Sequence, residues 1–579
     1  MRATVALALL LAACRSAPAP KGHFNEQTAL HPRSRIAESE SYVQALREEY
    51  QALGRIQNVL RWYSSTQGEV SLTQLSYIGH DRLFRKTALD AIAAVQQKPG
   101  LGGNDRLALT FFQRSLTGEI VALATARFDD EYDDAESSAT VALPWREKPV
   151  AYRDLQNLIA QEPDSDRRQL AFAAMNVVRV SKLNPILERK EEAAQKAARE
   201  TGFADYVALS EDLRQVKLDT LLAAGVAYVK ATEGVFRTTL DRVAREELGI
   251  PREKLRVSDL GRLYKAPRLA QFFDKALELK VLDAFLAGIG LDLHTAAGTE
   301  VTIDDALHPK KRPRAFVNAI DAPRDVRMSV KPTGGLDDYE TLFHEAGHAV
   351  HFASSTIAPK ELIDLGYGAP TEAFGEFFRH AFSDPRWLLR YRALLAAQGR
   401  PQPTDAELSA VLRRLALKEM MYIRRYAFAK IAYELRLHGR PAAQIAVATP
   451  LLAAPEKTGE LRELYRQLFS VAYTFELSEQ ESHLFRTDVD DTFYSADYSR
   501  AFALAGMMHD GVRRRFGEDW YANKEVGHFL RGQLFSAGTS LSSEDVAERL
   551  GFPARVDFDA AAARAHRLVA EADALEKAK

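Results

Sequence analysis

Cysteine is almost absent from the 579-residue sequence, which contains only Cys14. A single cysteine excludes an intrachain disulfide framework and every metal site built from several thiolates. The sequence also lacks an excess of charge of either sign. It has 77 Lys and Arg residues and 79 Asp and Glu residues, which gives a formal net charge of −2. Such a chain has no overall positive field for a nucleic-acid backbone or an anionic membrane surface, so neither is a predicted partner.

The N-terminal residues resemble a targeting signal. The apolar run from Ala3 to Ala13 has about 11 residues, whereas a helix needs ~20 to span a bilayer and a signal-peptide core about 7–15. The run ends in Leu11-Ala12-Ala13-Cys14, which resembles the bacterial lipobox, where the cysteine sulfur takes a diacylglyceryl group before cleavage. We expect a lipoprotein signal peptide at 1–13, lipidation of Cys14 and a tether at 14–38. An ordinary secretory signal with an incidental cysteine is the alternative.

The residue after this cysteine bears on location. Arg15 follows Cys14 rather than an aspartate, and by resemblance to proteobacterial lipoproteins this argues against retention in the inner membrane. We therefore expect a periplasm-facing lipoprotein of the bacterial cell envelope, held in the outer membrane. Contact with the membrane is expected only through the N-terminal lipid.

Residues that break helices are few, with 32 Gly and 23 Pro in the whole chain. From Ser39 to Gln97 and from Leu107 to Ala126, apolar residues recur at spacings of three and four, which predicts amphipathic helices. Strand-like alternation occurs mainly at 315–320 and 326–330 and predicts a short β-ribbon. The fold is thus expected to be mostly α. After the tether we expect two regions, at 39–204 and 205–579.

The segment after the ribbon carries a metal-ligand pattern. His344, Glu345 and His348 lie within an apolar stretch, Leu342 to Phe352, that suits a buried helix. Residues four apart share one helical face, so the two histidines can present their imidazoles to one metal ion. Glu345 would then lie beside a metal-bound water, whose pKa zinc lowers from ~15.7 towards ~7, and could accept its proton as general base. Two core histidines are the alternative.

A third ligand is expected downstream, because a catalytic zinc site uses three protein ligands and keeps the fourth position open. Pro370 and Thr371 suit a helix start, and Glu372 and Glu376 then lie one turn apart on the same face. We interpret Glu372 as the third ligand and Glu376 as the carboxylate that orients a ligand histidine through its free N–H. Their neighbours, such as Phe374, are apolar, which disfavours the alternative of a solvated helix face.

The segment from Leu336 to His351 resembles the thimet oligopeptidase and oligoendopeptidase F family of zinc metallopeptidases, whose hallmark is HExGHxxH with a downstream glutamate. The block from Thr371 to Glu376 is also similar to the ligand block of the angiotensin-converting enzyme group. The resemblance covers about Glu188 to Phe552. It implies a large helical zincin-type metallopeptidase with a deep substrate channel, one Zn²⁺ per chain and a catalytic role for residues 205–579.

The spacing of Tyr494 and Tyr498 resembles the family's tyrosine-rich segment, whose hydroxyls reach the substrate carbonyl. The resemblance implies that these hydroxyls share the charge of the developing oxyanion with the metal, Tyr498 being the preferred donor. The chain departs from the family pattern at Ala501, where a further tyrosine is expected, and at Asp488 and Asp490, which stand where a histidine is expected. Core packing of the two tyrosines at helical spacing is the alternative.

Together these patterns predict a zinc-dependent peptidase for short unstructured oligopeptides, with Glu345 as general base and then as proton donor to the leaving amine. One alternative is a dipeptidyl carboxypeptidase of related mechanism. It would need a cation for the substrate's C-terminal carboxylate, for which Arg500 and Lys524 are candidates. The other alternative is a non-catalytic outer-membrane lipoprotein that binds peptides. Its signature would be loss of the base or of a ligand, and both are intact.

Overall fold

A computed structural model describes the chain at 32–68, 72–293, 300–306, 311–312, 315–440 and 461–577, with side chains from residue 39 onwards. Cys14, the predicted signal peptide and most of the predicted tether lie outside the described residues. Helices dominate the described part, which confirms the prediction of a mostly α fold. Among the described helices, none combines the length and the apolar character needed to cross a membrane.

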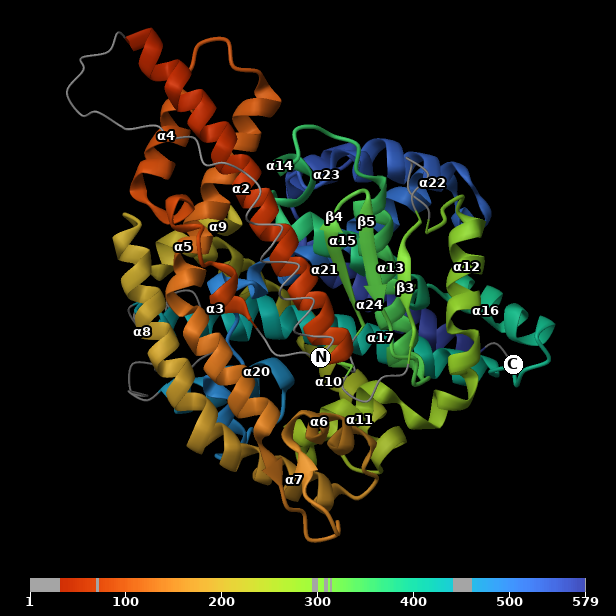
Figure 1. Cartoon of the computed structure of the whole chain (residues 1–579). Helices are drawn as coiled ribbons and strands as arrows, with labels where there is room; N and C mark the ends of the chain where they lie inside the picture. Colours follow the sequence, from red (N-terminus) through yellow and green to blue (C-terminus); the bar gives the residue numbers. More distant parts are fainter. Residues whose placement is uncertain are drawn as a thin grey trace.

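Helices of the first 200 residues pack on one another at one side of the molecule (Figure 1). They are α2 (Pro32–Gln67), α3 (Thr73–Ser76), α4 (Lys86–Gln96), α5 (Gly103–Ser138), α6 (Tyr152–Gln161), α7 (Ser165–Val178) and α8 (Asn184–Glu200). Two short strands, β1 (Thr140–Val141) and β2 (Val150–Ala151), pair antiparallel between α5 and α6. Leu46 and Leu53 of α2, Ile92 of α4 and Phe112 of α5 share one apolar core.

The rest of the chain adds the helices that hold the chemistry-bearing motifs. They are α9 (Tyr206–Arg214), α10 (Leu218–Leu248), α11 (Val257–Lys265), α12 (Glu278–Gly288), α13 (Leu336–Ser354), α14 (Glu361–Asp364), α15 (Gly368–Arg379), α16 (Pro385–Ala397), α17 (Asp405–Ile423), α18 (Ile431–Leu437), α20 (Leu461–Tyr473), α21 (Ser495–Phe516), α22 (Glu525–Phe529), α23 (Ser543–Arg549) and α24 (Phe558–Lys577). Ala198 of α8 and Val207 of α9 belong to the same core, so apolar packing continues across 204/205. The boundary there stays a prediction.

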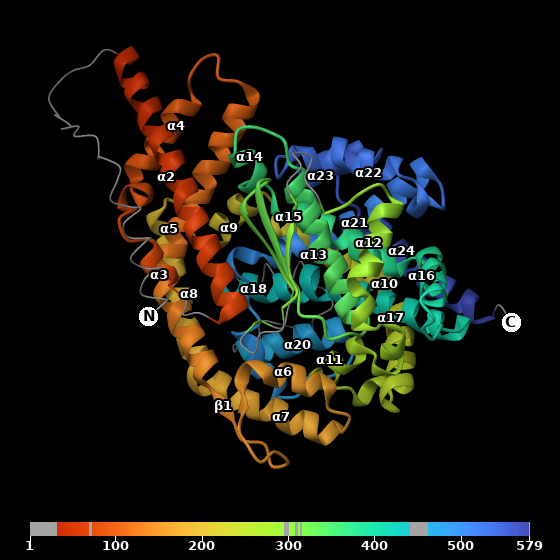
Figure 2. The same cartoon turned by 45° about the vertical axis from the view of Figure 1, so that its right-hand side comes forward.

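The predicted ribbon forms as part of a three-stranded sheet. Strand β4 (Phe316–Asp321) pairs antiparallel with β5 (Asp325–Ser329), and β3 (Thr302–Asp304) adds to β5 in parallel, giving the order β3-β5-β4. The sheet lies against α13, and α2 runs along its edge strand β4 (Figure 2). Asn58 of α2 joins the two, because its side chain donates to the Ala319 carbonyl at 3.2 Å and its own carbonyl accepts from Asn318 at 2.7 Å.

Helix α15 packs against both α13 and α21, so it lies between the two other helices that carry motif residues. It begins at Gly368, two residues before the start predicted at Pro370. The proline is tolerated inside the helix because N–H groups of the first turn have no partner within the helix. The earlier start leaves Glu372 and Glu376 one turn apart, as the sequence predicts.

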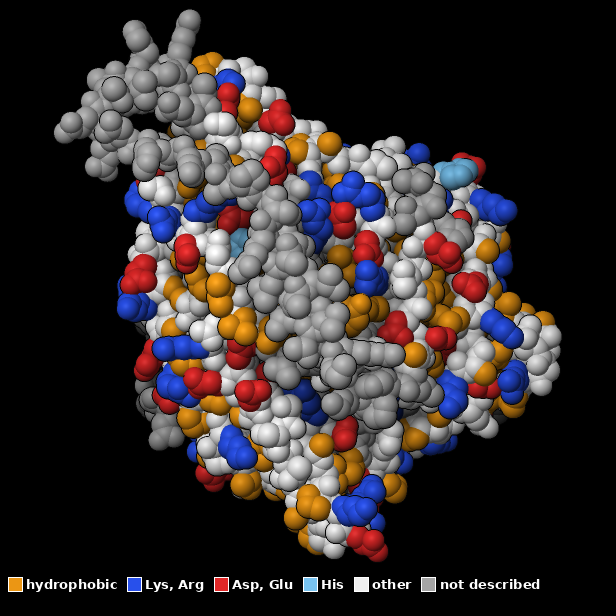
Figure 3. Space-filling model, in the orientation of Figure 1, with side chains coloured by type: hydrophobic (Ala, Val, Ile, Leu, Met, Phe, Trp, Pro, Cys, Tyr) orange, Lys and Arg blue, Asp and Glu red, His pale blue; other side chains and the backbone are white. Residues whose placement is uncertain are grey.

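Acidic and basic side chains are interspersed over the face that Figure 3 shows. Among the described residues, charged side chains at the surface form ion pairs, as Arg153 does with Glu136 at 2.9 Å and with Asp133 at 3.1 Å. The described side chains on this face therefore form no extended field of one sign, in keeping with the net charge of −2.

Candidate metal centre

Two glycines let α13 and α15 cross with their backbones in contact. A Cβ atom at Gly347 would lie 2.6 Å from the Phe374 carbonyl oxygen and 2.8 Å from Gly375 Cα. A Cβ atom at Gly375 would lie 2.8 Å from two ring atoms of His344 and 3.0 Å from His348 Nε2. Real Cβ atoms essentially never make contacts shorter than 3.0 Å, so glycine is required at the crossing. The crossing brings the histidines of α13 against the carboxylates of α15.

The side chains of His344, His348 and Glu372 meet at this crossing. Their ligand atoms lie within 4.8 Å of one another, and the described residues contain no other group of three His, Cys, Asp or Glu side chains this close. The two Nε2 atoms are 3.1 Å apart, and Glu372 Oε2 is 3.5 Å from His344 Nε2 and 3.6 Å from His348 Nε2. Ligands ~2.1 Å from a tetrahedral zinc ion are ~3.4 Å from one another, so this triangle has the size of one tetrahedral face.

The charge state of Glu372 fits a cation. Its Oε2 atom is buried and has no hydrogen-bond partner among the described residues. Burial alone would raise the pKa of Glu372, but His348 and His344 lower it well below its ordinary value. An ionised oxygen without a donor, facing two imidazole nitrogens, is a donor set typical of a catalytic zinc site. The residues present therefore fit zinc.

Glu376 lies behind the first histidine. Its Oε1 atom is 3.1 Å from His344 Nδ1 and 2.7 Å from Arg379 Nη2, and its side chain is fully buried. Burial raises the pKa of Glu376, but the charges of Arg379 and His344 outweigh burial and lower it. The 3.1 Å separation places an ionised Glu376 oxygen opposite Nδ1 of His344, which favours a proton on Nδ1 and a free lone pair on Nε2. A role for Arg379 was not predicted from the sequence. The only feature that could have indicated one is a cation one helical turn after a glutamate predicted to be buried.

Glu345 follows His344 on α13 and lies beside the edge strand of the sheet. Its carboxylate lies close to the backbone N–H of Val317 in β4. Burial raises the pKa of Glu345, while His344 and His348 oppose this rise. A raised pKa brings a carboxyl group closer to the range in which it can both take up and return a proton near neutral pH.

The two tyrosines of the resemblance occupy different positions at the start of α21. The Tyr494 hydroxyl donates to Glu372 Oε1 at 2.5 Å. The Tyr498 ring meets Tyr494 edge-on at 5.0 Å and stacks on Tyr426 at 5.3 Å. Burial raises the pKa of Tyr498, and the charges of Glu372 and Glu345 raise it further. The Tyr498 hydroxyl therefore stays protonated close to the metal group.

Several residues suggested by the sequence lie outside the metal group. His351, the last histidine of the motif, is fully buried and contacts a backbone carbonyl of the loop before α23 at 3.0 Å. Arg500 is buried and donates to Asp497 at 2.7 Å, a carboxylate that it shares with Arg214. Lys524 is exposed just before α22. Neither cation belongs to the metal group, and nothing in the described part of the chain supports the dipeptidyl carboxypeptidase alternative.

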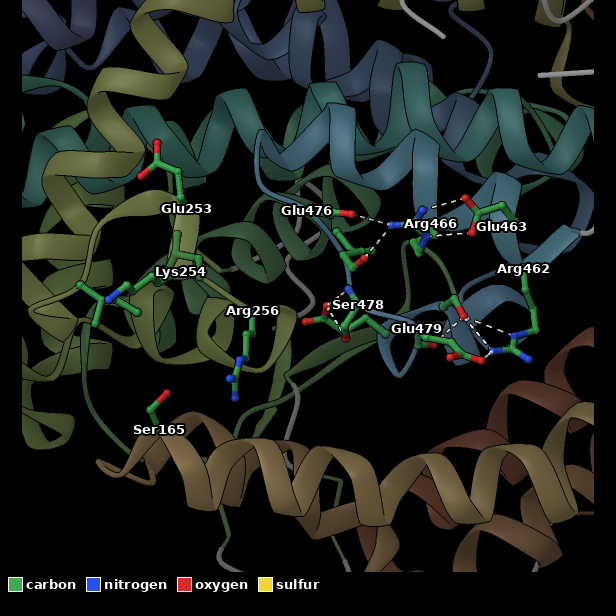
Figure 4. Close-up of a pocket in the computed structure, with 15 residues that line it drawn as sticks. Ser165, Glu253, Lys254, Arg256, Arg462, Glu463, Arg466, Glu476, Ser478 and Glu479 are labelled. Carbon is green, nitrogen blue, oxygen red and sulfur yellow. Dashed lines mark hydrogen bonds and ion pairs between the residues drawn. The ribbon is translucent and has the colours of Figure 1, made fainter. Parts of the chain in front are cut away.

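Figure 4 shows a cavity of about 880 Å³. It opens between the start of α7, the segment 253–256, α20 and the segment 476–482. None of its lining residues belongs to the metal group or to the tyrosine pair. Its wall is polar and internally paired, as Arg466 is with Glu463 at 2.7 Å and with Glu476 at 3.1 Å.

With this geometry in place, residues 330–567 match peptidase family M3. The matched segment contains α13, α15 and α21, and hence every residue of the metal group and both tyrosines. The chain carries a peptidase family M3 domain. The M3 domain makes the chain a metallopeptidase and confirms the family resemblance predicted from the HExGHxxH segment.

No curated protein matches this sequence. Among solved structures, the chain is similar to a "putative oligoendopeptidase F" from Bacillus anthracis str. Ames. The TM-score is 0.62 and the identity 13%, over 94% of this chain and 92% of that chain. At this identity the likeness shows the fold alone. It confirms that the M3 domain belongs to a large helical architecture that extends over nearly the whole chain.

Proposed function

We propose that this M3 metallopeptidase is a zinc-dependent oligopeptidase that hydrolyses short unstructured peptides. The observation that carries the proposal is the triangle of His344 Nε2, His348 Nε2 and Glu372 Oε2, with edges of 3.1, 3.5 and 3.6 Å. These three residues would hold one zinc ion. The similar solved structure is described as a "putative oligoendopeptidase F", which supports the choice of oligopeptides as substrates.

Zinc bound by these residues would supply Lewis acidity, which polarises a carbonyl and lowers the pKa of water from ~15.7 to ~7. Glu345, next to His344 on α13, would accept the proton of the attacking water, and its raised pKa favours this role. The same carboxyl group then returns the proton to the leaving amine. Because the base ends the cycle ionised again, one glutamate serves both proton transfers.

The remaining polar groups hold the reacting groups in place. The Glu376 carboxylate favours a proton on Nδ1 of His344. This fixes the direction of the Nε2 lone pair of His344. The Tyr494 hydroxyl donates a hydrogen bond to Glu372 Oε1, so that Glu372 Oε2 is left to bind the metal. The Tyr498 hydroxyl donates a hydrogen bond to the oxyanion that develops on the scissile carbonyl.

The assignment of Glu372 and Glu376 is tested by zinc content after identical dialysis against a mild chelator. Glu372→Ala leaves two protein ligands and should lose zinc. Glu376→Ala should keep most of its zinc while metal affinity or activity falls ~10–100-fold. Glu361→Ala is the control, because this buried glutamate pairs with Arg47 at 2.6 Å outside the metal group. Zinc retained by Glu372→Ala and lost by Glu376→Ala would reverse the two roles.

A further inference from the structure

The segment that leads into α21 has an unusual backbone. Thr492 and Phe493 have φ values of 49° and 53°, in the left-handed region that residues with a side chain rarely adopt. Tyr494, which contacts Glu372, follows directly. Strained conformations of this kind persist only where surrounding groups hold them. The groups that hold Thr492 therefore also determine where the Tyr494 side chain lies.

Both ends of α9 hold Thr492. The Tyr206 hydroxyl, at the first residue of α9, accepts a hydrogen bond from the Thr492 N–H at 2.8 Å. Arg214, at its last residue, donates from Nε to the Thr492 carbonyl at 3.0 Å and from Nη2 to Thr492 Oγ1 at 2.6 Å. The N–H, the carbonyl and the hydroxyl of Thr492 thus each have a hydrogen-bond partner on α9. Helix α9 lies outside the segment that matches peptidase family M3.

Arg214 also contacts Tyr494 and Asp497, which lie at the start of α21. Its guanidinium carbon lies 4.7 Å from the centre of the Tyr494 ring. Its Nη1 atom donates to Asp497 Oδ2 at 2.9 Å, and Asp497 is 1% exposed. Asp497 in turn abuts the start of α15, because a Cβ atom at Gly368 would lie 2.5 Å from Asp497 Oδ2. The arginine therefore connects α9, the start of α21 and the start of the helix that carries Glu372.

We propose that Arg214 is a positioning residue for the metal group, acting through Thr492 and Tyr494 on the orientation of the Glu372 carboxylate. Tyr494 holds Oε1 of that carboxylate, so that Oε2 faces the two imidazoles. Without Arg214 the Thr492 backbone relaxes, the Tyr494 hydroxyl leaves Oε1, and the carboxylate can rotate away. The inference rests on the proposed role of Glu372 as a ligand.

The test is zinc affinity, measured on the full-length protein by competition with a chelating dye. The variants are Arg214→Lys, which keeps the charge but loses the fork of donors, Tyr494→Phe, and the double variant. We expect each single change to weaken zinc binding, Tyr494→Phe by ~10–100-fold. The double variant should bind zinc no more weakly than Tyr494→Phe alone, because both changes interrupt the same chain of contacts. With zinc in excess, kcat should fall in both single variants while KM stays near the wild-type value.

Arg168→Lys is the matched control. Arg168 is buried, pairs with Asp259 at 2.7 Å and donates to two backbone carbonyls, and none of these partners belongs to the metal group. It should lose thermal stability as Arg214→Lys does but keep wild-type zinc affinity. If Arg214→Lys does not fold, Tyr206→Phe replaces it, since this change removes only the hydroxyl that accepts from Thr492.

Wild-type zinc affinity in a folded Arg214→Lys or Tyr206→Phe variant would overturn the proposal. So would losses that multiply in the double variant, because they would mean that Arg214 acts independently of Tyr494. Failure of the proposed function would look different: Glu372→Ala would then bind zinc as tightly as the wild type.

Discussion

Replacing Gly347 by alanine tests whether the close crossing of α13 and α15 builds the metal group. The added Cβ atom would lie 2.6 Å from the Phe374 carbonyl oxygen, whereas ordinary contacts begin at 3.4 Å, so the backbones must separate by about 0.8 Å. No side-chain rotation can relieve the contact, because the atoms it meets belong to the backbone of Phe374 and Gly375. The separation moves Glu372 away from the two histidines.

A displacement near 1 Å in a catalytic site can cost ~10²-fold in rate, and overpacking of this kind costs ~1–3 kcal/mol in folding free energy. We therefore expect Gly347→Ala to lower kcat/KM for a fluorogenic peptide by about 10²-fold, to lose zinc more readily and to unfold at a lower temperature. The control is Gly234→Ala in α10, where a Cβ atom would meet nothing within 4 Å. That change should stabilise the protein by up to ~1 kcal/mol, because alanine favours helix more than glycine does. Wild-type activity and zinc retention in Gly347→Ala would mean that the close crossing of α13 and α15 does not build the metal group.

Three further predictions concern other parts of the chain. Tyr498→Phe should lower kcat ~10²–10³-fold without changing zinc content, and an unchanged kcat would remove Tyr498 from the oxyanion role. Burial and the neighbouring Asp338 raise the pKa of Glu278 from 4.5 to about 8. Protonated Glu278 therefore contributes fully to the free energy of unfolding below pH 4.5, and this contribution is lost as the pH rises through 8. Glu278→Gln should therefore raise the free energy of unfolding in urea more at pH 8 than at pH 5, by an amount on the order of a few kcal/mol, and equal gains at both pH values would contradict this. Labelled palmitate should enter the wild-type protein and not Cys14→Ser, and incorporation that survives the substitution would exclude the lipoprotein assignment.

The parts of the site that follow from local periodicity could be predicted from the sequence. His344 and His348 share a helical face because they are four residues apart, and that relation needs no knowledge of the rest of the chain. Glu372 and Glu376 stood out because carboxylates among aromatic neighbours need a buried partner. The structure brings His344, His348 and Glu372 together, while their roles as ligands stay predictions until a metal is measured.

The contacts that position these residues could not be predicted, because they join distant segments. Arg214 and Thr492 are 278 positions apart and meet only in the folded chain. In the sequence, Gly375 is only a residue with low helix propensity. The folded chain shows why glycine is required there, because the His344 ring lies where a Cβ atom would be. Strand β3 was missed because three residues are too few to show alternation, and it pairs with β5 from a separate segment.

The proposed role of Glu345 as the base of a zinc-dependent hydrolysis is best tested by two measurements on purified wild type and Glu345→Gln. These are zinc content and the rate of peptide hydrolysis. We predict about one zinc per chain in both proteins, because Glu345 is not among the proposed ligands, and a loss of ~10²–10⁴-fold in hydrolysis in the variant. Hydrolysis by Glu345→Gln at the wild-type rate, with zinc present, would contradict it.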